Sequence, residues 1–442
     1  MKRGLAVAVV FVFGVPIALS ANWPQWRGPQ GTGTSDERDL PLTWSATENV
    51  AWRADLGGVG VSSPIVIGNM VIVTSQAGKS PSKQGPRLAQ GAGPDGLGER
   101  SMGTARGATD APDQPMFLVE AYDRQSGKRL WQYRTEAIGP IPTSHDKANM
   151  ALSSPVSDGS MVYAWFSNGQ LVALNMTGAL LWQRHLGKDL GTFDIEWGHS
   201  SSPTLFEDTL ILLCDNNNAS NLLAVDKKTG IERWRVDRGP KRQSYSTPFV
   251  VPGSAGPELV VNSSQRVDVY NPRTGDLLWH VGNPHQFPIP SPTYHDGVLY
   301  MSRGYRSGPY MAVRTGGRGD VNNSHVVWQA ATGAPYISSL VYDAGLVYMT
   351  TDIGGITAVD AMTGERVWQQ RVGTVFSASP VVGDGKVYFT SETGAIIVIK
   401  SGAREPSILA RNEMGERFIA SPAISNGRLF FRSDDRLFSV GR

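Results

Sequence analysis

The chain has 442 residues, with 41 Lys and Arg against 39 Asp and Glu, 50 Gly, 28 Pro and one Cys. The single thiol, Cys214, excludes an intramolecular disulfide and a zinc site built from paired cysteines. A net charge of +2 gives no electrostatic reason to expect nucleic acid as a partner, and the high glycine content favours many short strands joined by turns.

Residues 1–20 have the features of a secretory signal peptide. Basic residues at positions 2 and 3 precede an apolar run from Leu5 to Leu19, with small residues at positions 18 and 20. The run is shorter than the ~20 residues needed to cross a bilayer, and no cysteine follows it to accept a lipid. We expect cleavage near Ala21, an N-terminal extension over 21–49, and a periplasmic or secreted protein with no remaining transmembrane segment.

A short head motif then repeats along the chain: two small residues, a proline and a β-branched run. The third position of the head falls at Pro64, Pro155, Pro203, Pro248, Pro292, Leu340, Pro380 and Pro422. The first interval contains an insertion over 77–115, and the later heads recur every 40 to 48 residues. Four-stranded units of about 40 to 45 residues are typical of β-propeller blades, so eight heads predict eight blades.

Turn and tryptophan spacings define the strands inside each unit. Dipeptides such as Asp158-Gly159 and Asn426-Gly427 predict the first hairpin turn. In the second turn a glycine precedes a tryptophan by four residues in five units: Gly127–Trp131, Gly178–Trp182, Gly230–Trp234, Gly275–Trp279 and Gly364–Trp368. Seven tryptophans, at 52, 131, 182, 234, 279, 328 and 368, fall on predicted fourth strands, where we expect them to pack between blades.

The last head leaves room for only three strands, the third of them around residues 437–440. Residues 50–56 match the tryptophan strand, but no three strands precede them. We therefore predict that strand 50–56 completes the eighth blade and closes the ring, which removes open sheet edges. The predicted fold class is all-β, an eight-bladed propeller of four-stranded antiparallel blades over 50–442.

Two kinds of loop emerge on one face of such a ring, which we call the rim face. They are the interblade loops, which lead into each first strand, and the loops that join second to third strands. The ligand-binding candidates on these loops are His145, Asp194, Glu196, Trp197, His199, Asp215, Arg242, His285, Arg303, Asp352 and Arg432. Such a mixture of basic, acidic and aromatic side chains suits a polar ligand or an extended peptide. The alternative is a solvated loop face.

Three segments of the rim face have more specific alternatives. The run from Asp194 to His199 has enough carboxylate and imidazole groups for a metal or an acid/base pair. The run from Asp215 to Asn218 offers oxygen ligands for calcium but lacks the alternating spacing of calcium loops, and such runs are more often turns. The Gly- and Pro-rich insertion 77–115 predicts a loop that a partner could order into a lid.

Three segments, VDKKTGIERW (225–234), YNPRTGDLLW (270–279) and VDAMTGERVW (359–368), resemble the pyrroloquinoline-quinone-like (PQQ-like) propeller repeat. With the opening NWPQWRGPQGTG (22–33), the chain is similar to exported bacterial proteins of the quinoprotein alcohol dehydrogenase-like superfamily. The resemblance implies two functional types. Quinoprotein alcohol dehydrogenases bind PQQ with a calcium ion over the channel, whereas the assembly lipoprotein BamB binds proteins without catalysis.

The sequence favours the second type. It contains no adjacent cysteines, no heme attachment sequence and no set of Glu, Asn and Asp that matches the dehydrogenase motif. We expect an exported, monomeric, non-catalytic propeller that uses the rim face to bind an envelope or extracellular protein, peptide or polysaccharide, with no metal or cofactor. The alternative is a PQQ-dependent or other oxidoreductase with PQQ and calcium.

Overall fold

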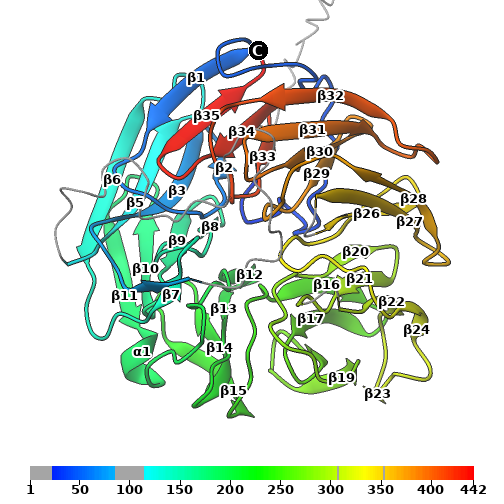
Figure 1. Ribbon diagram of the computed structural model, residues 1–442. Helices are drawn as coiled ribbons and strands as arrows, with labels where there is room; N and C mark the ends of the chain where they lie inside the picture. The colour runs from blue at the N-terminus through cyan, green and yellow to red at the C-terminus, as the bar shows by residue number, and fades with distance from the viewer. Residues whose placement is uncertain (1–21, 85–113, 306–307, 352–353) are drawn as a thin grey trace, which may run out of the picture.

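The computed structural model describes residues 22–84, 114–305, 308–351 and 354–442, which form eight β-sheets around a central channel (Figure 1). Each sheet is a blade whose first strand lies next to the channel and whose fourth strand lies at the outer edge. The all-β, eight-bladed propeller predicted from the head motifs is confirmed.

Blades 1 to 4 follow one another along the chain. Blade 1 contains β2 (Ile65–Ile67), β3 (Met70–Ala77), β5 (Met116–Asp123) and β6 (Arg129–Glu136); blade 2 contains β8 (Val156–Ser157), β9 (Met161–Trp165), β10 (Gln170–Asn175) and β11 (Leu180–His185). Blade 3 contains β12 (Thr204–Phe206), β13 (Thr209–Cys214), β14 (Ser220–Asp226) and β15 (Glu232–Gly239); blade 4 contains β16 (Phe249–Gly253), β17 (Gly256–Asn262), β18 (Val267–Tyr270) and β19 (Leu277–Val281). A fifth strand, β23 (Gly319–Asp320), pairs in parallel with β19.

Blades 5 to 8 complete the ring. Blade 5 contains β20 (Thr293–His295), β21 (Val298–Ser302), β22 (Tyr310–Arg314) and β24 (Val326–Ala330); blade 6 contains β25 (Val341–Asp343), β26 (Leu346–Thr351), β27 (Gly355–Asp360) and β28 (Arg366–Arg371). Blade 7 contains β29 (Val381–Gly383), β30 (Lys386–Thr390), β31 (Ala395–Lys400) and β32 (Ile408–Glu413); blade 8 contains β33 (Ala423–Ser425), β34 (Arg428–Arg432), β35 (Arg436–Val440) and β1 (Val50–Asp55). A short helix, α1 (Leu186–Asp189), and the pair β4 (Ser82–Lys83) and β7 (Ser144–His145) lie in the loops.

The ring closes as the sequence predicts. Strand β1 pairs antiparallel with β35, with Arg53 opposite Phe438. The N–H of Leu56 also donates to the carbonyl of Asp435 (2.9 Å). Because β1 is the fourth strand of blade 8, the N-terminal and C-terminal parts of the propeller share one sheet.

Each strand packs against two neighbouring blades at once. In β13, Leu210, Leu212 and Cys214 lie in a cluster with blade 2, whereas Ile211 and Leu213 lie in a cluster with blade 4. Successive side chains of a strand point to opposite faces. This explains why the second and third strands are apolar over most of their length.

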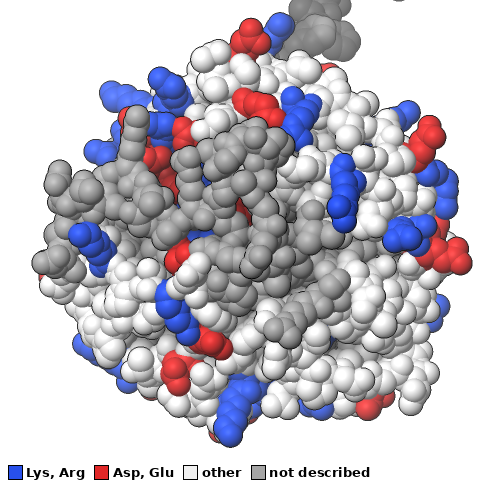
Figure 2. Space-filling view, in the orientation of Figure 1, with Lys and Arg blue, Asp and Glu red and all other residues white. Residues whose placement is uncertain are grey.

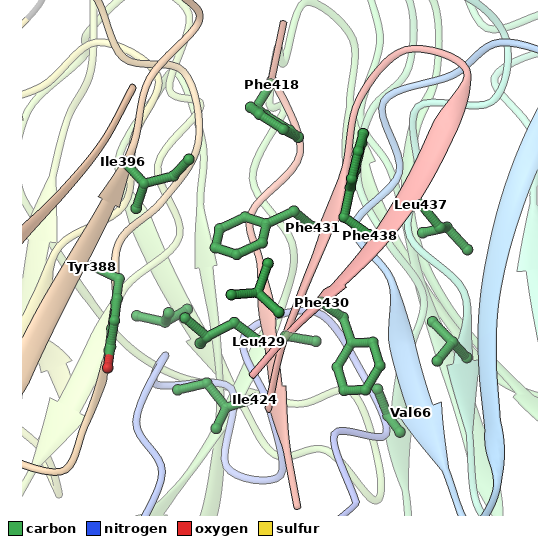
Figure 3. Packing of buried hydrophobic residues seen from close by; sticks show 14 of the residues in the cluster. Val66, Tyr388, Ile396, Phe418, Ile424, Leu429, Phe430, Phe431, Leu437 and Phe438 are labelled. Atoms are coloured by element: carbon green, nitrogen blue, oxygen red, sulfur yellow. The ribbon is translucent and has the colours of Figure 1, made fainter. Parts of the chain in front are cut away.

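The largest apolar cluster joins blades 7, 8 and 1, where the ring closes. In Figure 3, Phe430 and Phe431 of β34 point to opposite sides of their sheet, toward Val66 and Tyr388 respectively. The Phe430 ring lies 6.0 Å from that of Trp52 in β1. Closure therefore rests on apolar burial as well as on strand pairing.

The second residue of every head takes part in a closed ring of hydrogen bonds. Its backbone N–H donates to the side-chain hydroxyl of the equivalent residue in the next blade, at 2.8–3.0 Å in all eight cases. The order is Ser63, Ser154, Ser202, Thr247, Ser291, Ser339, Ser379, Ser421 and back to Ser63. We call these residues the hydroxyl ring. They link each blade to the next around the channel.

A second contact recurs at the outer edge of the ring. The indole N–H of Trp182 donates to the Lys227 carbonyl in the next blade (3.0 Å), and the corresponding bond forms from Trp52, Trp131, Trp234, Trp328 and Trp368. A Cβ atom at Gly230 would lie 2.8 Å from the Trp182 ring. The turn glycine therefore contacts the tryptophan of the preceding blade, so the expected packing of tryptophan between blades is confirmed.

The N-terminal extension, described from residue 22, enters the channel. Trp23 forms an antiparallel bridge with Val66 of blade 1, and Thr34 forms a parallel bridge with Val382 of blade 7. Farther along, the Trp44 ring packs 5.9 Å from the Phe431 ring. Residues 22–34 thus fill part of the channel next to the inner strands before the chain turns outward to β1 (Figure 1).

Arg27 anchors the extension. Its guanidinium is buried and donates to the carbonyls of Thr32 (2.8 Å) and Pro292 (3.0 Å) and to that of Leu340. Burial lowers the pKa of this group. The bonds to Pro292 and Leu340 tie the extension to the heads of blades 5 and 6.

Removing one hydroxyl of the ring should measurably destabilise the protein. The variant Ser339→Ala leaves the buried Ser291 N–H without its acceptor, which should lower the free energy of unfolding by about 1–3 kcal/mol. Urea unfolding of wild type and variant measures the difference. The control Ser254→Ala changes an exposed serine and should stay within about 0.5 kcal/mol of wild type. Equal effects of the two substitutions would contradict a stabilising role for the ring.

A matched pair of glycine substitutions isolates the contact between turn and tryptophan. Gly230 (φ 72°) and Gly385 (φ 67°) have nearly the same backbone conformation, but nothing lies within 4 Å of a Cβ at Gly385. Gly385→Ala should cost about 1–2 kcal/mol of unfolding free energy from backbone strain alone. Gly230→Ala should cost a further ~1–3 kcal/mol, because the new methyl group collides with Trp182. Equal losses in a urea titration would show that the tryptophan contact is unimportant.

Candidate functional site at the mouth of the channel

A cavity of about 230 Å³ lies at the rim-face mouth of the channel. The Trp26 side chain of the N-terminal extension contributes to it, and its indole N–H lies 3.4 Å from the Ser421 hydroxyl. Six of the eight residues of the hydroxyl ring also line the cavity. The extension and the hydroxyl ring therefore form the floor of this pocket.

The wall of the pocket comes from one repeated position in the interblade loops. The residue two positions before each member of the hydroxyl ring lines the cavity in all eight blades: Val61, Leu152, Ser200, Tyr245, Ile289, Ile337, Ser377 and Ile419. Because the hydroxyl ring fixes the heads relative to one another, equivalent positions face the channel in every blade. Five of the eight are aliphatic, so the wall is largely apolar.

Aromatic side chains complete the pocket. Trp197, Tyr336 and Phe376 line it together with Tyr245 and the floor residue Trp26. Tyr336 and Phe376 are largely buried. The pocket can therefore remove an apolar group from water and present aromatic ring faces and edges to it.

One ion pair lies at the pocket and joins two distant blades. The ammonium of Lys147, in the loop that leads into blade 2, lies 2.9 Å from the Glu392 carboxylate of blade 7. The Ser377 hydroxyl donates to the same carboxylate (2.5 Å). The two charges neutralise each other, so the pair adds no net charge to the pocket.

Outside the pocket, Lys and Arg side chains alternate with Asp and Glu side chains around the edge of the face shown in Figure 2. This distribution offers both signs of charge to a partner. Apolar burial within the pocket is therefore a stronger basis for recognition than attraction by one sign of charge.

Two of the eleven candidates from the sequence, His145 and Trp197, line the pocket. Their rings lie 5.5 Å apart. Lys83, at the start of the insertion, places its ammonium 4.4 Å from the centre of the Trp197 ring. A cation over an indole face is favourable, so the start of the insertion lies against this part of the rim.

The Asp194–His199 run does not bring its polar groups together. Asp194 and Glu196 are exposed and alternate with the buried Phe193 and Ile195. His199 is fully buried and its Nε2 lies 2.8 Å from the Leu213 carbonyl. Burial lowers the pKa of His199 to about 4. The imidazole is therefore a neutral core group, separated from the two carboxylates.

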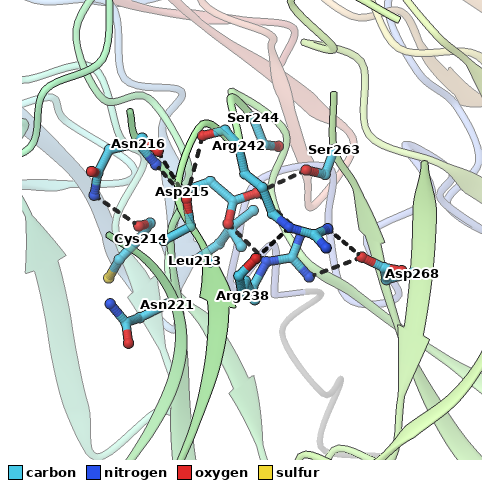
Figure 4. A network of polar contacts seen from close by, with 12 residues as sticks. Leu213, Cys214, Asp215, Asn216, Asn221, Arg238, Arg242, Ser244, Ser263 and Asp268 are labelled. Carbon is cyan, nitrogen blue, oxygen red and sulfur yellow. Dashed lines mark hydrogen bonds and ion pairs between the residues drawn. The ribbon is translucent and has the colours of Figure 1, made fainter. Parts of the chain in front are cut away.

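Asp215 and Arg242 belong to a network between blades 3 and 4 (Figure 4). Both carboxylate oxygens of Asp215 accept from the buried Arg238 guanidinium, at 2.7 and 3.1 Å. Asp268 in turn accepts from Arg242 (2.8 Å) and from Arg266 (2.6 Å). Burial opposes ionisation of Asp268, but these cations and Arg238 hold its pKa below the usual value. The charges of these two candidates are thus paired within the protein.

Arg303 directly follows the second strand of blade 5, and Arg432 is the last residue of the second strand of blade 8. Both are almost fully buried, and burial lowers the pKa of each to about 10. Arg303 donates to the Ser263 carbonyl in blade 4 (2.7 Å), and Arg432 donates to the Thr74 carbonyl in blade 1 (2.6 Å). Each arginine therefore joins its blade to a neighbour.

Two candidates remain. The Nε2 of His285 lies 2.8 Å from the Tyr305 carbonyl, and the side chain does not line the pocket. Asp352 lies outside the described residues, as do the signal peptide predicted over 1–20 and most of the insertion (77–115).

Sequence reasoning missed most of the pocket. It placed Trp26 in the N-terminal extension without a role in binding, and it did not single out Lys147 or the aliphatic residues of the wall. The repeat could have identified the wall. The residue two positions before each head hydroxyl occupies an equivalent place in all eight units, so these eight residues should face the channel together. The sequence analysis chose candidates for their charge or aromatic character. Several of these side chains instead link neighbouring blades.

Two negative findings concern the described ranges. There, no helix is long and apolar enough to cross a bilayer. In the same ranges, no three His, Cys, Asp or Glu side chains come together in an arrangement suited to a metal ion.

Comparison with known proteins identifies similar chains. A family model described as outer membrane protein assembly factor BamB matches residues 115–370, 318–405 and 354–440. Over 257 residues the chain is 23% identical to that factor from Yersinia pestis, a match that covers 55% of this chain and 58% of the relative. The predicted resemblance to PQQ-like propellers is confirmed.

Solved structures show the same fold. The structure of BamB from Moraxella catarrhalis has a TM-score of 0.54 at 16% identity, covering 74% of this chain and 88% of that chain. Quinohemoprotein alcohol dehydrogenase from Comamonas testosteroni has a TM-score of 0.62 at 12% identity, covering 96% and 81%. At these identities the likeness establishes the fold and leaves the chemistry open.

The described pocket does not fit PQQ and calcium. Calcium takes six to eight oxygen ligands, usually several of them carboxylates. Glu392 is the one carboxylate among the described residues that line the pocket, and it already pairs with Lys147. PQQ itself has carboxylate groups, which an aliphatic wall would leave without partners. The residues that line the pocket therefore do not suit PQQ with calcium.

His199 predicts a specific pH dependence of stability. Its pKa of about 4 lies below the ordinary value of 6.5, so the unfolded chain binds more protons between these pH values. Stability from this group is present above pH 6.5 and is lost as the pH falls toward 4, with a slope of up to ~1.4 kcal/mol per pH unit. Unfolding titrations from pH 7 to 4 should show this slope for wild type and a shallower one for His199→Phe. Parallel curves would mean that His199 is not held neutral.

Proposed function

Because this chain belongs to the outer membrane protein assembly factor BamB family of PQQ-like β-propellers, we propose that it is an exported, non-catalytic scaffold that binds a protein partner through the mouth of its channel. The observation that carries the proposal is the apolar pocket built from all eight interblade loops. A site assembled from every blade presents one recognition surface.

The polar residues support binding over catalysis. Three charged or imidazole candidates, Asp215, His199 and Arg303, are buried and hydrogen-bonded within the protein. An acid/base catalyst must lie within hydrogen-bond reach of a substrate. These groups instead hold the blades in position around the pocket.

The proposed compartment follows from the N-terminal sequence and the family. Cleavage of the signal peptide near Ala21 would leave a chain that begins at the extension in the channel, in the periplasm or outside the cell. The relatives are factors of outer membrane protein assembly. For this chain we propose only that the partner is a protein of the cell envelope.

A blocked pocket tests the proposal. Ile337→Trp fills the wall with a large side chain, whereas Leu181→Trp adds the same residue at an exposed position on the outer strand of blade 2. Affinity purification from an envelope extract of the source cells should recover the same partners with wild type and Leu181→Trp. Ile337→Trp should lose them.

Both variants must first show the wild-type unfolding transition, so that loss of partners is not loss of fold. If Ile337→Trp retains every partner at wild-type yield, the binding face lies elsewhere on the propeller.

A further inference from the structure

We infer that the pocket at the channel mouth binds one aromatic side chain of an extended, uncharged peptide segment, with Trp26 as the floor on which its ring packs. This inference rests on the proposed function and names the chemistry of the partner. It depends on the size of the cavity, on its lining and on what already occupies the channel below it.

The size fits one ring. An engineered cavity of about 150 Å³ holds a single benzene molecule, whereas pockets for drug-sized ligands and cofactors have about 300–1,000 Å³. At about 230 Å³ the pocket accommodates a phenyl or indole group but not an extended cofactor.

The lining fits an aromatic group. Aromatic side chains prefer offset or edge-to-face contacts with other rings. Five rings line the pocket, those of Trp26, Trp197, Tyr245, Tyr336 and Phe376, and five aliphatic side chains complete the wall. A ring in the pocket would meet other rings below and at the side.

The lining does not fit a charged group. Among the described lining residues, His145, Lys147 and Glu392 are the ones that can carry a charge near neutral pH, and Lys147 and Glu392 neutralise each other. The described lining includes no Asn, Gln, Asp or Arg side chain. A charged side chain would lose water there without gaining an unpaired partner of opposite charge.

The channel already accommodates a peptide segment with tryptophan side chains. Residues 22–34 lie in it, with the Trp23 ring buried against blade 1 and the Trp26 ring at the pocket. Residues 25–33 form successive turns there, so the lower channel accepts a turned backbone with tryptophan side chains. A partner segment that enters from the rim face would contact the Trp26 ring from the pocket side.

Binding of short peptides to the full-length protein tests the inference directly. The probes are acetyl-Gly-Gly-X-Gly-Gly-amide peptides with X as 4-fluorophenylalanine, alanine, glutamate or lysine, and maltoheptaose serves as the sugar. Isothermal titration calorimetry gives affinities, and ¹⁹F spectra report the ring directly. The fluorophenylalanine peptide should bind at least tenfold more tightly than the others, and Ile337→Trp should abolish its binding.

A specificity exchange tests the role of Trp26. Trp26→Ala removes the floor and deepens the pocket, so a peptide with the longer 4-phenylphenylalanine should bind more tightly than the 4-fluorophenylalanine peptide. Wild type should show the opposite order. Ile337→Ala, which widens the wall, provides a second variant with the same expected trend. A merely structural role for Trp26 would lower both affinities alike.

The outcomes separate the inference from the proposed function. Equal binding of the alanine and 4-fluorophenylalanine peptides, or tighter binding of maltoheptaose, overturns the inference. If Ile337→Trp nevertheless loses its envelope partners, the proposed function stands. If the aromatic peptide binds in the pocket but Ile337→Trp keeps every partner, the inference stands and the proposed function fails.

Discussion

The closed ring of eight hydrogen bonds between the heads is the constraint on which the rest of the structure depends. Each member donates through its backbone N–H and accepts through its hydroxyl, so every blade is linked to both neighbours. Such a ring is complete only when all eight heads lie at the same level around the axis. It therefore sets the radius of the channel, and with it the distance between the interblade loops that meet above. The tryptophan contacts repeat the same linkage at the outer edge.

The pocket and the linkages between blades compete for the same loops. A loop at a blade boundary has buried backbone carbonyls and N–H groups that need partners. Arg303 and Arg432 donate to such carbonyls, and Arg238, which pairs with Asp215, also bonds to Asp268 of the next blade; these side chains are buried as a result. The residues that remain directed at the channel are mostly aliphatic or aromatic. The apolar character of the mouth is thus a consequence of using the polar residues to join the blades.

The sequence predicted the contacts that repeat in every blade, but it did not predict the side chains that meet at the channel mouth. Repeated spacings report local hairpins and contacts that every blade makes, so the eight blades, the tryptophan packing and the closing strand β1 were predicted correctly. The direction of a loop side chain depends on its contacts with segments that are far away in the sequence. Lys147 and Glu392 meet across 245 positions, and no local pattern announces such a pair. The serine of the head motif was visible in the sequence, but its role as an acceptor requires the neighbouring blade.

The N-terminal extension shows why fold likeness to dehydrogenases does not transfer their chemistry. In this chain the channel below the pocket is occupied by residues 22–34, and the Nη1 and Nη2 groups of Arg27 donate there to backbone carbonyls. Removing the extension would leave the carbonyls of Pro292 and Leu340 without these donors and would expose the apolar surface that covers Trp23. Both effects are unfavourable. The extension is therefore a fixed part of the site, and it reduces the space above it to one that suits a single side chain.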